Sequence, residues 1–411
     1  MLEIITEILN QDQPLPESEI TKIINAANQG DAEAQFSLGS LYGKGEEVPQ
    51  NFNEAFKWYS KAAEQGHVHA QFYLGVMYHE GIGVKQNYSE AMKWLNKAVE
   101  KDFAMAQYQL GVVYDSGEGA PQNYEEATKW YRKAAEQGYE FAQFNLANMY
   151  YVGKGVPQDY EEAFKWYTKA AERNLAKAQY NLADMYYKGT GVVQDFSSAI
   201  HWYTKAAENG FELAQCDLGT FYYFGDCGVQ IDYNRALMWY KKAAEQGFAG
   251  AQNNLGNIFS SGKGVLQDYE EAFKWYLKAA EQNFAPAQFN LGNMYDNGRG
   301  VPHNSEEAAK WFAKSAEQGF APAQFNLSNM YRTGEGVPQD LTKTIEYLKK
   351  AAEQGFAPAQ NNLAIMYYEG EGVPQSYSEA AKWLQEAINN GYYGAISFIQ
   401  KHADIFKEFF Q

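Results

Sequence analysis

Apolar residues recur at helical spacing in pairs of short segments along almost the whole chain. In the first segment of one pair, Ala142, Leu146, Met149 and Tyr150 lie four, three and one residues apart, which places them on one helical face. The second segment has the same kind of face, formed by Tyr160, Ala163, Phe164, Tyr167, Ala170 and Ala171. The pattern therefore predicts two short amphipathic helices joined by a loop.

Turn and capping residues mark the ends of these predicted helices. The first helix ends at Gly153 and Gly155, which suit a left-handed C-cap. The second begins with a capping box, Asp159 with Glu162, and a small residue such as Asn174 closes it. In later pairs a proline enters the first turn of the first helix, where its missing N–H costs little, at Pro286, Pro322 and Pro358.

The pair of helices is one unit of a tandem repeat. Counting from the alanine of each Ala-Gln pair as position 0, the units begin at Ala34, Ala70, Ala106, Ala142, Ala178, Ala214, Ala251, Ala287, Ala323 and Ala359. The period is 36 residues, with one 37-residue step after Ala214. All nine tryptophans occupy one position of the cycle, which Tyr347 fills in the ninth repeat.

Helices of this length are unstable alone, so stacking must bury their apolar faces. We expect an all-α fold, an α-solenoid of tandem helix-turn-helix repeats. Residues 1–33 are expected to form an N-terminal helical cap, residues 34–394 the ten repeats, and residues 395–411 a C-terminal capping helix.

The repeated series Ala-Gln…Leu-Gly…Tyr…Gly-x-Gly-Val-x-Gln-Asp-Tyr…Ala…Trp-Tyr…Lys-Ala-Ala-Glu resembles the Sel-one-like repeat, a variant of the tetratricopeptide repeat. The resemblance covers residues 34–394. It implies a right-handed superhelix with the first helices on its concave side, and adaptor or scaffold work in protein complexes, often in bacteria. Two loops depart from the pattern, at Glu47 and at Asp226-Cys227-Gly228.

Paired asparagines on the first helices are the candidate ligand-binding residues. Positions 3 and 6 lie on one helical face, and a carboxamide can both donate to and accept from the backbone of an extended peptide. The candidate residues on this face are Asn145 with Asn148, Asn181 with Asp184, Asn254 with Asn257, Asn290 with Asn293, Asn326 with Asn329, and Asn362 alone. In the alternative interpretation, these side chains bond to one another between repeats and face water.

Aromatic residues give a second candidate feature of the same helices. Position 2 holds Phe or Tyr in most repeats, either as pockets for a bound segment or as packing against the neighbouring first helix. Tyr151, Tyr187, Tyr223 and Phe224 add aromatics to repeats four to six, which we expect to be a hot-spot region. Cations on the first helices are too few for a clamp around a dicarboxylate tail.

Charge and composition narrow the range of partners. The formal charge of −17 disfavours nucleic acid and anionic membranes, so we expect a protein or extended-peptide partner and no membrane insertion. With two cysteines, no basic leader and no long apolar run, the chain is expected to be cytoplasmic, although signal-independent export would leave the same pattern. The oligomeric state is left open.

Signals for chemistry are weak, so no catalytic residue, metal or cofactor is expected. The one Ser-x-x-Lys, residues 260–263, lies in a loop without the other motifs of the β-lactamase class that labels some family members. His67, His69 and His79 lack metal-ligand spacing. The sequence favours a protein- or peptide-binding adaptor. The alternative is a structural or self-assembling scaffold that uses the outer face, the ends, or the Phe406/Phe409/Phe410 cluster.

Overall fold

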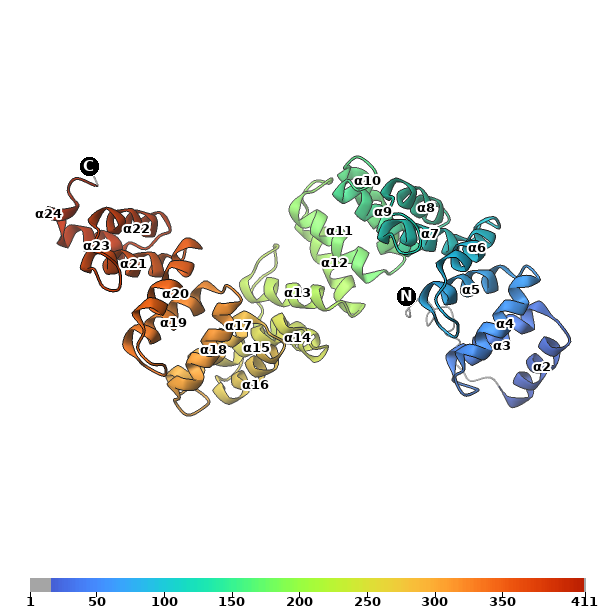
Figure 1. Ribbon diagram of the computed structural model, residues 1–411, viewed down its shortest axis with the longest axis horizontal. Helices are drawn as coiled ribbons and strands as arrows, with labels where there is room; N and C mark the ends of the chain where they lie inside the picture. Colours follow the sequence, from blue (N-terminus) through green and yellow to red (C-terminus); the bar gives the residue numbers. More distant parts are fainter. Residues whose placement is uncertain (1–15, 410–411) are drawn as a thin grey trace. The chain divides into compact units, whose positions relative to one another are not determined.

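The structure is a computed structural model that describes residues 16–409. Within this range it is all-helical, and the chain divides into two compact units, Met1–Asn209 and Gly210–Gln411. Figure 1 shows each unit as a run of helices that pack in chain order, as an α-solenoid does. None of the described helices is long and apolar enough to cross a membrane.

Each repeat contributes a first and a second helix. The first helices are α3 (Ala32–Lys44), α5 (Val68–Glu80), α7 (Ala104–Ser116), α9 (Glu140–Val152), α11 (Ala176–Lys188), α13 (Glu212–Phe224), α15 (Ala249–Ser261), α17 (Ala285–Asn297), α19 (Ala321–Thr333) and α21 (Ala357–Glu369). The second helices are α4 (Phe52–Glu64), α6 (Tyr88–Val99), α8 (Tyr124–Glu136), α10 (Tyr160–Glu172), α12 (Phe196–Glu208), α14 (Tyr233–Glu245), α16 (Tyr269–Glu281), α18 (Ser305–Glu317), α20 (Leu341–Glu353) and α22 (Tyr377–Asn389). Shorter helices flank them at the two ends: α2 (Glu17–Asn28), α23 (Gly394–Lys401) and α24 (Ala403–Phe406).

The helix ends follow the predicted turn chemistry with one exception. Gly153 ends α9 in the left-handed conformation, with φ 78°, and Pro286 lies in the first turn of α17. Asp159 caps α10 by accepting from the Glu162 backbone N–H at 3.0 Å. The reciprocal half of the predicted capping box is wrong, because the Glu162 carboxylate binds Lys165 at 2.7 Å instead.

The glutamine at position 1 of each repeat is buried and ties successive helices together. In most repeats its Nε2 donates to an alanine carbonyl of the preceding second helix, as Gln324 does to Ala316 O at 3.1 Å, while Gln107 donates to Asp102 instead. In most repeats its Oε1 accepts from an amide about thirty residues later at the end of its own repeat, as Gln324 does from Gln354 at 2.8 Å. A buried carboxamide with both ends paired fixes the register of three helices.

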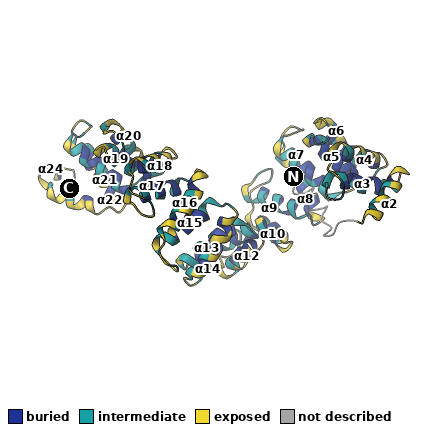
Figure 2. Cartoon of the chain, turned by 90° about the horizontal axis from the view of Figure 1, so that it is seen from below, coloured by how far each residue is buried: buried dark blue, intermediate teal, exposed yellow. Residues whose placement is uncertain are grey.

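The core lies between neighbouring helices, where Figure 2 shows the buried residues. Small alanines such as Ala279 and Ala280 let helices approach closely. The tryptophans pack between repeats, and in most repeats the lysine three residues further on covers the indole, as Lys278 Nζ does 4.2 Å from the Trp275 ring centroid. The predicted lysine–glutamate pairs on the second helices, such as Lys274 with Glu271, are present and exposed.

The two ends of the described chain are covered by short helices. Ile20 and Ile23 of α2 pack against the core that contains Leu38. At the other end Phe406 is fully buried against the last repeat, so it is a core residue rather than part of an exposed cluster. Phe409 is 46% exposed, and Phe410 lies outside the described residues.

Candidate functional site

The first helices α13 to α21 expose a surface with four successive hollows, all within the unit that begins at Gly210. We call this the first-helix surface; it consists of the side chains at positions 3, 6 and 9 of repeats six to ten and the loop residues beside them. The hollows measure about 480, 260, 190 and 120 Å³ in chain order. Each contains at least two of the asparagines predicted as ligand-binding residues.

The largest hollow lies between repeats six and seven. Its lining includes Tyr223, Phe224, Asn254 and Asn257, all singled out from the sequence. Phe224 is 67% exposed, which is unusual for a side chain of this size. No residue that lines this hollow carries a charge, although the whole chain is strongly acidic.

The asparagines at position 6 divide into two groups according to a tyrosine on the second helix of their own repeat. Asn257 Oδ1 accepts from the Tyr276 hydroxyl at 2.8 Å, and Asn148 accepts from Tyr167 in the same way. In repeats eight and nine the tyrosine is replaced by Phe312 or Leu348, which have no hydroxyl. The second group therefore lacks this partner.

Asparagines at position 3 bond to the preceding repeat, which is the arrangement of the alternative interpretation. Asn290 Nδ2 donates to Asn253 Oδ1 at 2.9 Å, and Asn326 Nδ2 donates to Asn293 Oδ1 at 3.3 Å. Asn254 contacts Cys216 Sγ at 3.8 Å. These bonds orient the carboxamides, and each leaves at least one N–H or oxygen lone pair of the pair without a partner.

Asn329 and Asn362 differ from the others. Both are half-buried, and neither side chain forms a hydrogen bond with another residue in the described part of the chain. They line the same hollow of about 120 Å³, beside Arg332. Of the predicted site residues, these two offer the most complete set of free donors and acceptors.

The predicted residues of repeats four and five lie in the other unit, and their side chains have more partners within the chain. The Asn145 carboxamide lies close to the Tyr108 and Tyr131 hydroxyls, and the Asn181 carboxamide lies close to the Tyr167 hydroxyl. Asp184 forms an ion pair with Lys188 at 2.8 Å. The Asn145 and Asn181 contacts reach the preceding repeat, whereas the Asp184 ion pair stays within its own helix.

The tyrosines at position 9 pack on the start of their own second helix. Tyr151 lies 5.2 Å from Tyr160 and Tyr223 lies 5.4 Å from Tyr233, both edge to face; Tyr187 packs on Phe196 at 5.7 Å. The expectation that such aromatics mark the central repeats alone is wrong, since Tyr368 of repeat ten packs on Tyr377 at 5.5 Å. Phe224 remains distinctive because it is exposed.

The aromatic residues at position 2 are half-buried or, at Phe72, buried in packing contacts. Phe289 lies 5.8 Å from Phe312 of its own repeat and 5.4 Å from Phe320 in the following turn. Phe325 repeats the second contact with Phe356 at 5.5 Å. These contacts favour packing over open pockets, although the ring partners lie on the same repeat's second helix and in the turn before the next first helix rather than on that helix itself.

Two features of the fold, one exposed and one buried, were not predicted from the sequence. Several loops place a cation between their two glycines, at Lys154, Lys263 and Arg299. The buried position-1 glutamines accept hydrogen bonds from a second amide side chain. The glutamine or asparagine that recurs thirty residues later in most repeats is the sequence signal for this contact. Both features recur at regular spacings in the sequence, but neither follows from asking which residues share one face of a helix.

Comparisons with known proteins agree with this architecture. The sequence profile of the Sel1 repeat matches residues 32–67, 68–103, 104–139, 141–175, 176–211, 213–248, 249–284, 285–320, 321–356 and 357–392. The crystal structure of c5321, a protective antigen of uropathogenic Escherichia coli strains with an SLR fold, is 35% identical. That similarity covers 95% of this chain and 90% of c5321, with a TM-score of 0.67. A Sel1 repeat protein from Oxalobacter formigenes is 33% identical over 79% of this chain and 99% of its own, with a TM-score of 0.58. No match was found among curated proteins.

Proposed function

Because the chain belongs to the Sel1 repeat family, whose members generally mediate contacts between proteins, we propose that it is an adaptor that binds an extended segment of a partner protein. The segment lies along the first-helix surface of repeats six to ten. The observation that carries the proposal is the row of four hollows, whose linings include the predicted asparagines.

Chemistry and spacing support this binding mode. Side chains at positions 3 and 6 offer N–H donors and oxygen acceptors at the interval of one repeat, which suits the backbone of an extended chain. The free carboxamides of Asn329 and Asn362 provide such groups at one end, and the exposed Phe224 provides apolar contact at the other. Sel1 repeat proteins are generally non-catalytic scaffolds, which is consistent with an adaptor role.

Affinity capture from the native lysate tests the proposal. Wild type is compared with a variant in which Asn290, Asn293, Asn326 and Asn329 are changed to alanine, and circular dichroism confirms that both are folded. Four exposed second-helix changes in repeats seven and eight, Glu270, Lys274, Glu306 and Lys310→Ala, form the matched control. A partner that wild type and control retain and the asparagine variant loses supports the proposal; a partner that all three retain equally contradicts it.

A second candidate is self-association through the C-terminal end. Tyr393 is 72% exposed and Phe409 46%, which leaves apolar surface on the last helices. Sedimentation of wild type beside Tyr393→Ser tests this alternative. A change from oligomer to monomer would favour it, and a monomer in both cases would remove it.

A further inference from the structure

Two of the loop cations, Lys154 and Arg299, lie over the first tyrosine of the preceding repeat's second helix, whereas Lys263 lies over Tyr223. Each lies between the two loop glycines, and the second glycine packs on the start of the preceding repeat's second helix. A Cβ added at Gly300 would lie 2.4 Å from Tyr269 O, so this backbone approach requires glycine. As a result Arg299 Cζ lies 5.7 Å from the Tyr269 ring centroid, and Lys154 Nζ lies 4.0 Å from that of Tyr124.

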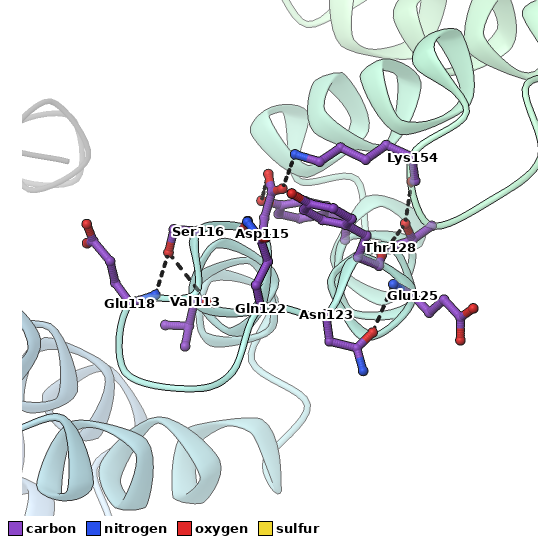
Figure 3. Close-up of polar contacts among 11 residues, drawn as sticks. Val113, Asp115, Ser116, Glu118, Gln122, Asn123, Glu125, Thr128 and Lys154 are labelled. Carbon is purple, nitrogen blue, oxygen red and sulfur yellow. Dashed lines mark hydrogen bonds and ion pairs between the residues drawn. The ribbon is translucent and has the colours of Figure 1, made fainter.

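At Lys154 the environment is completed by a carboxylate of the chain itself. Lys154 Nζ binds Asp115 Oδ1 at 2.9 Å, and the Tyr131 hydroxyl donates to Asp115 Oδ2 at 3.4 Å. Figure 3 shows the two charged side chains extended toward each other from neighbouring repeats. The carboxylate thus lies between a cation and a tyrosine hydroxyl.

At Arg299 the same environment lacks its carboxylate. The residue equivalent to Asp115 is Ser260, while Tyr276 is the equivalent of Tyr131. No carboxylate in residues 16–409 lies within ion-pair distance of Arg299. The space is instead part of the hollow of about 260 Å³, whose lining contains no acidic residue: Ser260, Tyr276, Asn290, Asn293, Asn297 and Arg299 line it with Tyr269 and Met294.

We propose that this hollow binds the carboxylate of an aspartate or glutamate side chain in the bound segment. The inference rests on the proposed function and adds the identity of one recognised residue. The Arg299 guanidinium supplies paired charge-assisted donors, and the Ser260 hydroxyl and Asn293 amide supply neutral ones. Since the chain carries a formal charge of −17, the segment has this acidic residue among uncharged ones rather than a run of acids.

The test uses N-acetylated, C-amidated peptide arrays in which one acidic residue is exchanged for its amide at each position. We expect wild type to prefer the acid by roughly ten-fold or more at one position. Arg299→Gln should abolish that preference. Lys274→Gln removes the same charge from the second helix α16 and should preserve the preference for the acid.

Two further variants use the internal comparison with Asp115. Ser260→Asp supplies the missing carboxylate, so it should abolish the acid preference while peptides with glutamine still bind. Asp115→Ser should create a second acid preference beside Lys154. Circular dichroism confirms folding of each variant.

The outcomes separate this inference from the proposed function. Peptide binding without acid preference, or acid preference that survives Arg299→Gln, overturns the carboxylate site and leaves the adaptor role intact. A parallel array of peptides with free C-termini gives the last control. Acid-dependent binding that appears only in that array would overturn the side-chain assignment, because the bound group would then be a terminal carboxylate. Absence of any peptide binding by wild type contradicts the proposed function and the carboxylate site together.

Discussion

The Gln354 amide donates to the buried Gln324 Oε1 at 2.8 Å, and this contact recurs through most of the solenoid. The bond joins the end of a repeat's second helix to its first helix, between residues thirty positions apart. Two repeats depart from it, because Lys101 and Arg173 stand where the amide donor belongs. In those repeats the buried oxygens of Gln71 and Gln143 have no hydrogen-bond partner.

Restoring the missing amide should stabilise the protein. We expect Arg173→Gln to raise the free energy of unfolding by about 1 kcal/mol, because a buried unpaired oxygen gains a donor. The measurement is the urea midpoint of the purified protein. Lys177→Gln, an exposed change of the same charge in the next helix, should shift stability by less than about 0.5 kcal/mol. An equal effect of both changes would mean that charge rather than the hydrogen bond is responsible.

The loop glycines give a second prediction about stability. Gly300 and Gly319 both have positive φ, 73° and 88°. A Cβ would meet Tyr269 O at 2.4 Å at the first and nothing within 4 Å at the second. We expect Gly319→Ala to cost about 1 kcal/mol and Gly300→Ala clearly more, by denaturant unfolding. Equal costs would show that backbone conformation alone decides both.

Tyr73 gives a prediction about alkaline pH. Its buried hydroxyl has no hydrogen-bond partner, and burial raises its pKa to about 12. Since the unfolded state ionises near pH 10, this residue lowers stability as the pH rises from about 10 to 12. We expect Tyr73→Phe to raise stability by about 1 kcal/mol at pH 7 and to flatten the alkaline loss. Urea midpoints at pH 7, 9 and 11 measure both effects, and an unchanged alkaline slope would contradict the assignment.

The hydrogen bond from a second-helix tyrosine to a position-6 asparagine can be introduced into repeat eight, which lacks it, by substitution. We expect Phe312→Tyr to engage Asn293 as Tyr276 engages Asn257, with a gain of about 1 kcal/mol. If Asn293 contacts the partner, the same change should weaken partner binding. Tyr276→Phe is the reciprocal variant and should lose a similar free energy. The measurements are thermal unfolding and affinity; stronger partner binding by Phe312→Tyr would exclude Asn293 from the site.

The helical repeat could be predicted because the apolar spacing, the turn glycines and the tryptophan column all recur at one period. The state of the asparagines could not, because it depends on tertiary contacts. Asn257 and Asn293 both end an Asn-Leu-Gly-Asn stretch. The Tyr276 hydroxyl donates to Asn257, whereas Phe312 has no hydroxyl to donate to Asn293. Likewise, the proposed carboxylate site depends on Arg299 lying beside Ser260 in the fold. These residues are 39 positions apart, and the pattern of helix faces does not connect them.

Photo-crosslinking from the first-helix surface tests the adaptor account most directly. A benzophenone amino acid replaces Asn329 in one protein and the exposed second-helix residue Lys310 in another, and each is irradiated with the native lysate. The account predicts that Asn329 crosslinks to an extended segment of a partner protein, identified by mass spectrometry, and that Lys310 does not. Crosslinks to that partner from Lys310 alone would place binding on the second helices and contradict the account.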